Sequence, residues 1–360
     1  MRLAAGAIVR STATAVVVAR LGRIVLARQP VRRAVSPCTT TISVVIPARN
    51  EAGRIVPLLG AMIGAPGVSE VIVVDDESTD GTASIAAAAG AGVVSAGGRP
   101  SGWAGKSWAL QCGLHAASSD WIVTLDADAR PDPGLPSAVV ARAEVDGTDL
   151  LTVAGRFRGH AAGARWLHAA MLTTLVYRFG APGRSPLPAP HRVLANGQCM
   201  AFRRTALLEL GGLSPVSGAV VEDVALARHL ARAGRRVDFL DASDLLHVEL
   251  YDSLAATWSG WGRSIGLPGV EPRWRQLVDV VTLTLTLPVP VLRLAVGRVD
   301  PIDLVALAAR LGTLVGTSRA FARRDLAYWL SPLADAVAIA ALIRNLSARR
   351  QTWSGRSYDL

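Results

Sequence analysis

Lysine is nearly absent from this chain. Of its 38 basic residues, only Lys106 is a lysine and the other 37 are arginines. The two side chains are not interchangeable, because arginine carries a wide planar guanidinium and lysine a compact, point-like ammonium. The single position that keeps lysine is therefore a candidate functional position.

Cysteine is also scarce. Cys38, Cys112 and Cys199 are far apart, odd in number and without a CxxC pair. This pattern argues against a disulfide framework and against a zinc site, and it favours a reducing, cytosolic compartment. The six histidines likewise lack the spacing of metal ligands.

The chain has no uninterrupted run of about 20 apolar residues at its start, although 51% of it is hydrophobic. Residues 1–35 are apolar but contain seven arginines and no acid. A nucleic-acid-binding protein spreads its basic face over the folded domain, so this localised charge favours an anionic membrane surface instead. We expect residues 1–36 to form a membrane-associated segment that either lies on the bilayer or spans it, with Pro37 in a linker.

From residue 41 onward, β-branched runs alternate with Ala-rich, capped stretches. This alternation predicts an α/β fold in which a mostly parallel sheet carries helices on both faces. The predicted strands are 41–47, 70–76, 92–96, 121–127 and 150–157, and the predicted helices between them are 52–65, 78–90 and 105–117.

Three of these strands end in polar clusters, at 48–51, 75–77 and 126–128. The carboxyl ends of parallel strands share one edge of the sheet, where ligands bind. The acidic excess at that edge would repel itself unless a cation lies among the carboxylates. Asp126 and Asp128 point to the same side, and such a pair can hold Mg²⁺ or Mn²⁺ together with substrate phosphates.

Lys106 opens a predicted helix after Gly102 and Gly105. A helix start with a lysine suits a phosphate group. The spacing is not that of a P-loop, so a P-loop NTPase is disfavoured.

Six motifs then occur in the order found in family-2 glycosyltransferases with the GT-A fold, which residues 41–270 resemble. They are VVIPARNEAGRI, VIVVDDESTDGT, GKSWAL, IVTLDADA, NGQCMAFRR and VEDVALARHLARAG. The resemblance implies a nucleotide-sugar site, a metal site and a catalytic base. It assigns Ala48, Arg49, Glu51, Asp76, Lys106 and Asp126 to the nucleotide sugar, Asp126 and Asp128 to the metal, and Asp223 to the base.

The implied reaction is an inverting, metal-dependent transfer from a nucleotide sugar, expected to be a UDP-sugar. The QxxRW motif of processive members is missing, and WSGWGRSIG (258–266) stands in its place. We therefore expect a single-transfer enzyme. Residues expected to form or support the acceptor site are Glu222, Gln198, Trp261 and Arg263.

The C-terminal third becomes apolar again and predicts a helical membrane region at 275–345, before a basic tail at 346–360. Its apolar segments are Val280–Leu292, Ile302–Ala322 and Leu326–Ile343, of which the last is the best candidate span. The tail TWSGRSYDL resembles that of bacterial membrane glycosyltransferases acting on hopanoids, carotenoids and other lipids. This resemblance implies a lipid acceptor. Because nucleotide sugars are made in the cytosol, we expect the enzyme at the cytoplasmic face of the cell membrane, and the localised basic charge argues against a nucleic-acid partner.

Two other functions fit part of the pattern. A nucleotidyltransferase also builds a nucleotide site at strand ends, but it leaves Glu222 and Asp223 without a role. A non-catalytic membrane scaffold could keep the fold and bind nucleotide or nothing, although all the acids of the motifs are present.

Overall fold

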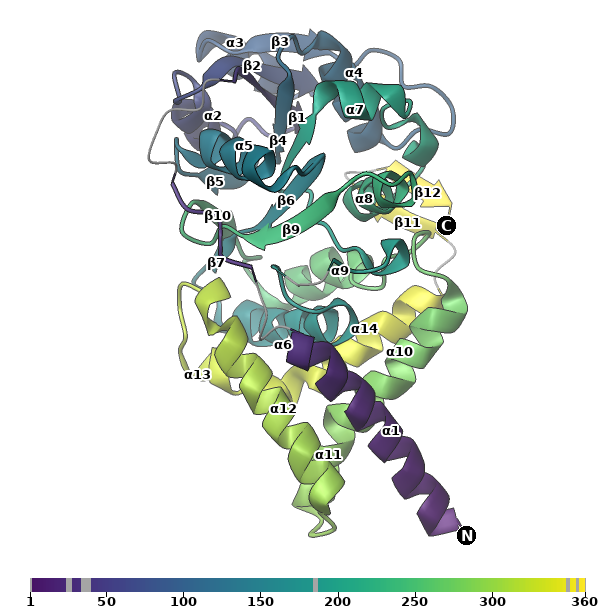
Figure 1. Ribbon diagram of the computed structural model, residues 1–360. Coiled ribbons are helices and arrows are strands. Elements are labelled where there is room, and N and C mark those ends of the chain that lie inside the picture. The colour runs from purple at the N-terminus through teal and green to yellow at the C-terminus, as the bar shows by residue number, and fades with distance from the viewer. Residues whose placement is uncertain are drawn as a thin grey trace.

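The computed structural model describes residues 2–23, 28–33, 40–183, 187–347, 350–353 and 356–359, with side chains from residue 6 to residue 346 of these ranges. A sheet domain forms one end of the molecule and a group of helices the other (Figure 1). Two predicted features lie outside the described residues: the linker at Pro37, and Gly355 of the C-terminal tail motif.

A seven-stranded sheet forms the centre of the first part. Its order is β3-β2-β1-β4-β8-β6-β9, and all neighbours run parallel except β8, which is antiparallel to β4 and to β6. The predicted mostly parallel α/β sheet is thus confirmed. The strands are β1 (Ile42–Ala48), β2 (Val68–Asp75), β3 (Gly92–Ser95), β4 (Trp121–Leu125), β6 (Leu150–Ala154), β8 (Cys199–Arg203) and β9 (Val237–Asp241).

Both faces of this sheet are covered, which is why its inner strands read as continuous apolar runs. In β1, Val44 and Ile46 face one apolar cluster and Val45 faces the other. The first cluster includes side chains of α2 (Val56–Met62), α3 (Thr82–Ala88) and α5 (Leu135–Asp146). The second includes side chains of α4 (Gly105–Ala116), α7 (Arg204–Glu209) and α8 (Glu222–Arg232).

The single strand predicted at 150–157 is wrong, because the chain changes sheets at Gly155. After β6 it continues as β7 (Arg156–Arg158), which belongs to a three-stranded sheet with β5 (Ala129–Pro131) and β10 (Leu246–Glu249). A Cβ at Gly155 would lie 2.9 Å from the Leu246 side chain. Glycine therefore permits the close approach of β10 at this break.

The helical end of the molecule combines both ends of the chain. The N-terminal helix packs against helices from the C-terminal third and against α6, and the N-terminus lies at the end farthest from the sheet (Figure 1). The helices are α1 (Arg2–Gly22), α6 (Ala162–Phe179), α9 (Leu254–Ser264), α10 (Arg273–Thr286), α11 (Pro288–Ala295), α12 (Pro301–Thr317), α13 (Leu326–Trp329) and α14 (Asp335–Ser347).

The prediction that Leu326–Ile343 is the best membrane span is wrong. Helix α13 ends at Trp329, a 3-10 turn containing Pro332 follows, and α14 begins only at Asp335. Proline breaks the helix because its ring removes an N–H donor and clashes with the preceding turn. By length and composition, one stretch of the described residues could cross a bilayer, the 23-residue Arg273–Ala295, and core helices of soluble proteins can meet the same test.

The packing of α4 on the sheet gives a testable prediction. A Cβ at Gly113 would lie 2.3 Å from Cγ1 of Val45, whereas a Cβ at Gly60 in α2 meets nothing within 4 Å. We expect Gly113→Ala to lower the free energy of unfolding by about 1–3 kcal/mol through overpacking. Gly60→Ala should raise it by about 0.4–1 kcal/mol, because alanine restricts the unfolded chain. Denaturant titration of both variants checks this, and equal effects would contradict the packing.

Candidate active site

The three polar strand ends meet at one edge of the sheet, as the sequence predicts. β1 lies between β2 and β4 and runs parallel to both, with Ala48 opposite Asp75. The loops after these strands therefore emerge side by side. They carry Arg49, Asp76 and Asp126 to the same edge.

A lysine lies between the acids at this edge. The Nζ of Lys106 is 2.7 Å from Oδ1 of Asp126 and 2.8 Å from Oε1 of Glu222. Lys106 is the second residue of α4, Asp126 follows β4, and Glu222 opens α8. One ammonium thus joins three elements that are distant in sequence. The sequence prediction placed Lys106 at the nucleotide but did not foresee these two partners.

The antiparallel strand β8 brings a fourth segment to the site. Cys199 at its start lies opposite Leu125 at the end of β4, and the N–H of Asp126 donates to the carbonyl oxygen of Gln198 at 3.3 Å. Gln198 itself is oriented by a hydrogen bond from the Asn196 side-chain amide to its Oε1 at 2.8 Å. Gln198 therefore supports the Asp126 loop through its backbone.

Asp223 is held by two backbone donors. The N–H of Gly197 donates to its Oδ2 at 2.7 Å, and the N–H of Val224 donates to its Oδ1 at 2.8 Å. A Cβ at Gly197 would lie only 3.1 Å from Nζ of Lys106, a tight contact that glycine avoids. Sequence reasoning missed Gly197, for which the Asn196-Gly197 turn pair is the only signal.

Burial and like charge shift the titration of these acids. Burial, followed by the charge of Glu222, raises the pKa of Asp223 to about 7, against the attraction of Lys106. Burial raises the pKa of Asp126 to about 6, again opposed by Lys106. Burial alone would lower the pKa of Lys106, but Asp126 and Glu222 raise it well above its usual value. Lys106 therefore stays charged, whereas the raised pKa values of Asp126 and Asp223 lie near neutral pH.

Asp128 is placed differently from its neighbour Asp126. It is half-buried, and within the described residues no hydrogen bond or ion pair reaches its carboxylate. Nor do the described residues include three or more His, Cys, Asp or Glu side chains grouped to hold a metal ion. Asp126 and Asp128 are oxygen donors of the kind that Mg²⁺ and Mn²⁺ prefer. The pair fits a metal whose remaining ligands come from a bound substrate.

The edge next to the acids is formed by the loops after β1 and β2. The guanidinium of Arg49 donates to the carbonyl oxygen of Asp76 at 2.6 Å. Asn50 and Glu77 adopt φ angles of 55° and 58°, an uncommon conformation for residues other than glycine. Glu51 is fixed by the Arg54 guanidinium at 2.9 Å, and burial raises its pKa. Three of the predicted nucleotide-site residues, Arg49, Glu51 and Asp76, therefore lie on these two loops.

The two acceptor-site candidates on α9 have different surroundings. Trp261 stacks on His168 of α6 with ring centroids 3.8 Å apart. Burial raises the pKa of Tyr251, with smaller, mutually opposing contributions from the charges of Arg263 and Asp128. Tyr251 therefore lies close enough to both Arg263 and Asp128 to feel their charges. Its ring packs on Gly260, where a Cβ would lie 2.3 Å from Cζ. No sequence signal indicated Tyr251.

Comparison with known proteins agrees with this arrangement. The family model for glycosyl transferase family 2 matches residues 43–211. An uncharacterized glycosyltransferase of Mycobacterium tuberculosis is 38% identical over 208 residues, which are 56% of this chain and 84% of that protein. The 4,4'-diaponeurosporenoate glycosyltransferase of Staphylococcus haemolyticus is 25% identical over 248 residues, 67% of this chain and 65% of that protein.

Among solved structures, the mannosyltransferase PcManGT of Pyrobaculum calidifontis, in complex with GDP-Man and Mn²⁺, shares the fold. Its TM-score is 0.53 at 20% identity, over 94% of this chain and 99% of that one.

The sheet, with its acids at the strand ends, defines a GT-A-like enzyme of sugar transfer. The chain belongs to glycosyl transferase family 2, and it is a glycosyltransferase. Membership in this family argues against the two alternative functions that the sequence left open, a nucleotidyltransferase and a non-catalytic membrane scaffold.

Replacing Lys106 tests its place between the acids. We expect Lys106→Met to lower the free energy of unfolding by about 1–3 kcal/mol at pH 8, because Asp126 and Glu222 lose their ionic partner. The loss should be smaller at pH 5. In the unfolded chain an Asp titrates near pH 4, whereas folded Asp126 already has a pKa of about 6 with the lysine present. Between pH 5 and pH 8, the folded Lys106→Met protein therefore binds more protons than its unfolded chain. Its free energy of unfolding falls as the pH rises, so the loss relative to wild type is larger at pH 8.

Thermal unfolding at pH 5 and pH 8 measures both effects. Lys106→Arg is the matched variant, which keeps the charge but must fit a guanidinium beside Gly197, where even an added Cβ would lie 3.1 Å from the lysine Nζ. It should recover only part of the stability. A Lys106→Met protein with wild-type stability at pH 8 would contradict the role of this ion pair.

Proposed function

We propose that this enzyme transfers a sugar from a nucleotide sugar, a UDP-sugar, to a hydroxyl of a lipid acceptor with inversion at the anomeric carbon, at the cytoplasmic membrane face. One observation supports this most. Asp223 has a pKa near 7 and lies beside Glu222, whose Lys106 partner also binds Asp126. The proposed base thus follows Glu222 in the chain, and the Lys106 ammonium links Glu222 to the donor-side Asp126.

Asp223 is the base in this proposal. An inverting transfer needs a group that takes the proton of the acceptor hydroxyl as its oxygen attacks the anomeric carbon. A general base works best when its pKa lies near the operating pH, and that of Asp223 is about 7. The two N–H donors from Gly197 and Val224 fix the carboxylate plane and leave further acceptor positions on both oxygens. Glu222 supports the site by holding Lys106.

The donor side is formed by the parallel strand ends. Ala48, Arg49, Glu51 and Asp76 would line the nucleotide pocket, and Lys106 would lie at the diphosphate. Asp126 and Asp128 would hold the divalent metal, Mg²⁺ or Mn²⁺, which when bound neutralises charge on the leaving diphosphate. The open carboxylate of Asp128 supports this assignment.

Two substitutions should separate the donor side from the base. Asp128→Asn should lose Mn²⁺-dependent binding of UDP-sugar, because it removes an ionic oxygen ligand. Asp223→Asn should keep donor binding and lose turnover by about 10²–10⁴-fold, the usual contribution of a general base. Titration calorimetry measures the first effect, and a transfer assay measures the second. In wild-type enzyme the rate should rise about tenfold per pH unit up to pH 7 and then level off.

Each outcome has a clear opposite. Full activity in EDTA, or a fully active Asp128→Asn protein, would remove the metal from the proposal. An Asp223→Asn protein that loses donor binding but keeps turnover in proportion to the donor bound would assign Asp223 to the donor site instead.

The lipid acceptor is supported by a relative and by the surface. The Staphylococcus haemolyticus relative is named for 4,4'-diaponeurosporenoate, an acceptor of the carotenoid type. In this chain the helical end next to the site exposes many large apolar side chains. Trp261 and Arg263 on α9 lie where the helical end meets the sheet domain and would contact or support the acceptor.

The acceptor is tested by fractionation followed by assay. We expect the protein in the membrane fraction and sugar transfer from a labelled UDP-sugar to an organic-phase lipid extract. UDP-, GDP- and dTDP-sugars should be compared under the same conditions. Transfer only to water-soluble acceptors by a protein found wholly in the soluble fraction would refute the lipid proposal.

A further inference from the structure

Helix α12 shows a reversed pattern of polarity. A helix on the surface of a water-soluble protein buries an apolar stripe and exposes a polar one. In α12, however, Asp303 and Arg310 are buried, while Leu304, Leu311 and Val315 are 55%, 58% and 62% exposed. In this helix two charged side chains face inward, while three large apolar side chains face outward.

The neighbouring helices follow the same rule. In α10, Gln276 and Asp279 are buried and Leu277 is 54% exposed. In α1, the Arg10 side chain is turned inward and 12% exposed, while Ile8 is 65% exposed. The reversal thus extends over helices from both ends of the chain.

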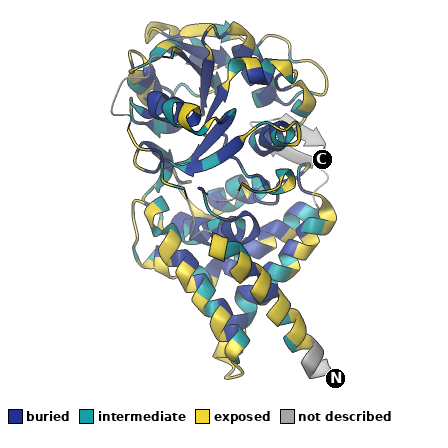
Figure 2. Ribbon diagram, viewed as in Figure 1, coloured by how far each residue is buried: buried dark blue, intermediate teal, exposed yellow. Residues whose placement is uncertain are grey.

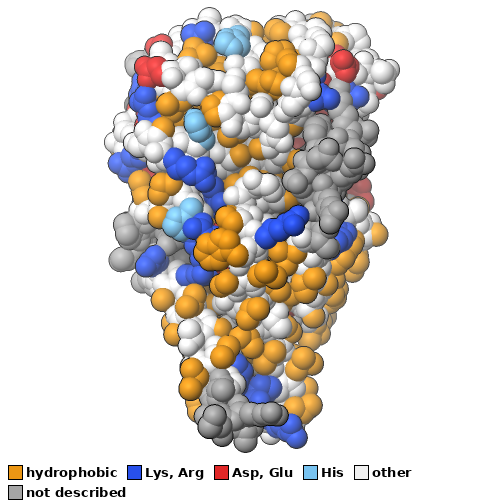
Figure 3. Space-filling model, turned by 90° about the vertical axis from the view of Figure 1, so that its right-hand side faces the viewer, with side chains coloured by type: hydrophobic (Ala, Val, Ile, Leu, Met, Phe, Trp, Pro, Cys, Tyr) orange, Lys and Arg blue, Asp and Glu red, His pale blue; other side chains and the backbone are white. Residues whose placement is uncertain are grey.

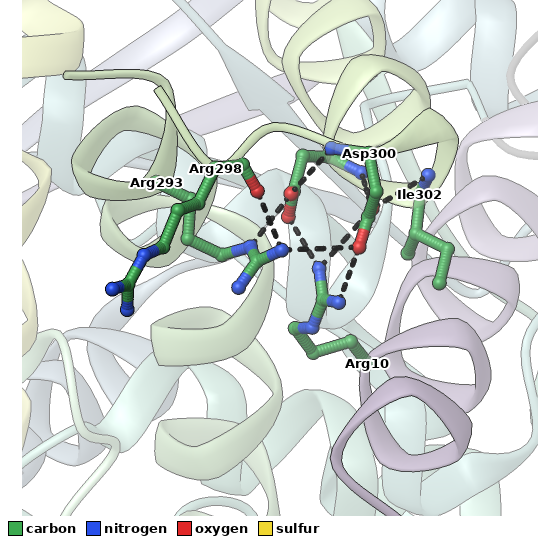
Figure 4. Close-up of polar contacts among 6 residues, drawn as sticks. Arg10, Arg293, Arg298, Asp300 and Ile302 are labelled. Carbon is green, nitrogen blue, oxygen red and sulfur yellow. Dashed lines mark hydrogen bonds and ion pairs between the residues drawn. The ribbon is translucent and has the colours of Figure 1, made fainter. Parts of the chain in front are cut away.

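The inward charges at the far end form a paired cluster, the tip network of Arg10, Arg293, Asp300 and Asp303, most of which is labelled in Figure 4. Arg10 of α1 donates to Asp300 at 2.5 Å and to Asp303 at 2.6 Å. Arg293 of α11 donates to Asp303 at 2.7 Å and to Asp300 at 3.2 Å. The network connects the N-terminal helix to the turn between α11 and α12.

Two further pairs lie nearer the sheet domain. Arg310 of α12 donates to Asp335 of α14 at 2.8 and 3.0 Å, with both side chains almost fully buried. Arg178 of α6 donates to Asp279 of α10 at 3.1 Å. Arg310 and Arg178 are therefore neutralised inside the helical group.

Apolar side chains cover the outside of this part of the molecule. Exposed residues predominate on the protruding helices in Figure 2, and in the view turned by 90° apolar side chains cover much of the same end (Figure 3). A dimer interface covers one side of a protein, whereas here the apolar side chains lie on the outward faces of α1, α10, α11 and α12. Outward apolar and inward paired charged residues are the arrangement that suits lipid hydrocarbon.

The end of the helices nearest the sheet has the features of a membrane interface. Trp274 opens α10 and is 61% exposed, and Trp329 closes α13 and is 42% exposed. Exposed arginines lie at the same end, at positions 23, 273, 323 and 324. Tryptophan favours the headgroup level and arginine the cytoplasmic side of a bilayer. The 21 residues of α1 give it a length of about 31 Å, close to the roughly 30 Å of the hydrocarbon core.

We propose that the outward faces of α1, α10, α11 and α12 lie in the hydrocarbon of a lipid bilayer, with the tip network as their charged interior. Because α10 begins and α12 ends at the sheet domain, these helices form a hairpin that enters and leaves from the same side. Arg10 then attaches α1 to the turn of this hairpin. The inference rests on the membrane location proposed above and adds which surface enters the lipid and what holds it together.

Binding of the purified full-length protein to vesicles of phosphatidylethanolamine and phosphatidylglycerol tests the outward face. Leu311→Glu should reduce the ratio of vesicle-bound to free protein at least tenfold in a flotation gradient, because it places a carboxylate in hydrocarbon. Val145→Glu is the matched control, since Val145 is 85% exposed on α5 of the sheet domain. It should float like the wild type.

The interior is tested with a second matched pair. Arg10→Ala leaves Asp303, which is almost fully buried, with Arg293 alone, so we expect a lower Tm in detergent micelles and weaker flotation. Arg298→Ala removes an exposed arginine at the same end, whose side chain points away from the network in Figure 4, and should change neither readout.

Other outcomes would overturn the inference. Equal flotation of the Leu311→Glu and Val145→Glu proteins would show that α12 does not face lipid. A lipid-free dimer that Leu311→Glu converts into a monomer would show that a second copy covers this surface. If Arg10→Ala behaves like Arg298→Ala, the tip network does not hold the helices together. Insertion without transfer to any lipid would refute only the acceptor proposed above, whereas a protein that stays with the aqueous phase would refute both.

Discussion

The ammonium of Lys106 is the constraint on which the site depends. Parallel strands bring several carboxylates to one edge, and α8 adds Glu222 and Asp223, so like charges accumulate in a partly buried space. Lys106 lies within 2.8 Å of both Asp126 and Glu222 and lets these two acids stay close. Gly197 leaves little room beside it, which accounts for a compact lysine in a chain that otherwise uses arginine.

The antiparallel direction of β8 brings the last group of residues to the candidate active site. Parallel strands alone would supply the proposed donor-side residues on the loops after β1, β2 and β4. Because β8 runs antiparallel to β4, its preceding loop reaches the same edge and delivers the N–H of Gly197 to Asp223. The proposed base is thereby positioned by backbone rather than by flexible side chains, which favours a fixed geometry for proton transfer.

The helical end is connected to the sheet domain through packed aromatic residues. Trp261 of α9 stacks on His168 of α6, and Phe157 of β7 contacts both His168 and Phe321. Burial lowers the pKa of His168 to about 3, so the imidazole is neutral and packs as an aromatic ring. The proposed lipid-facing surface and the sugar-transfer site can therefore share one rigid frame, with α9 between them.

Much of this protein could be read from its residues in order. The β-branched runs, the acids that follow them and the six motifs predict the parallel sheet, the shared edge and the family, because each depends on short segments with a strong local pattern. Boundaries were less accurate where tertiary contacts decide them. The strand predicted at 150–157 breaks at Gly155 because β10 approaches there. The span predicted at 326–343 fails for a local reason instead, because α13 ends at Trp329 and Pro332 lies in the turn that follows.

What the sequence determined by itself is the set of chemical groups: one lysine, a pair of carboxylates one residue apart, an acidic helix start and an apolar chain interrupted by arginines. What only the tertiary structure decided is which of these groups meet. Lys106 pairs with Glu222, which is 116 positions away in the sequence, and Arg10 pairs with Asp300, which is 290 positions away. Charge pairing at such separations depends on how sheets and helices pack, and no local pattern in the chain encodes it.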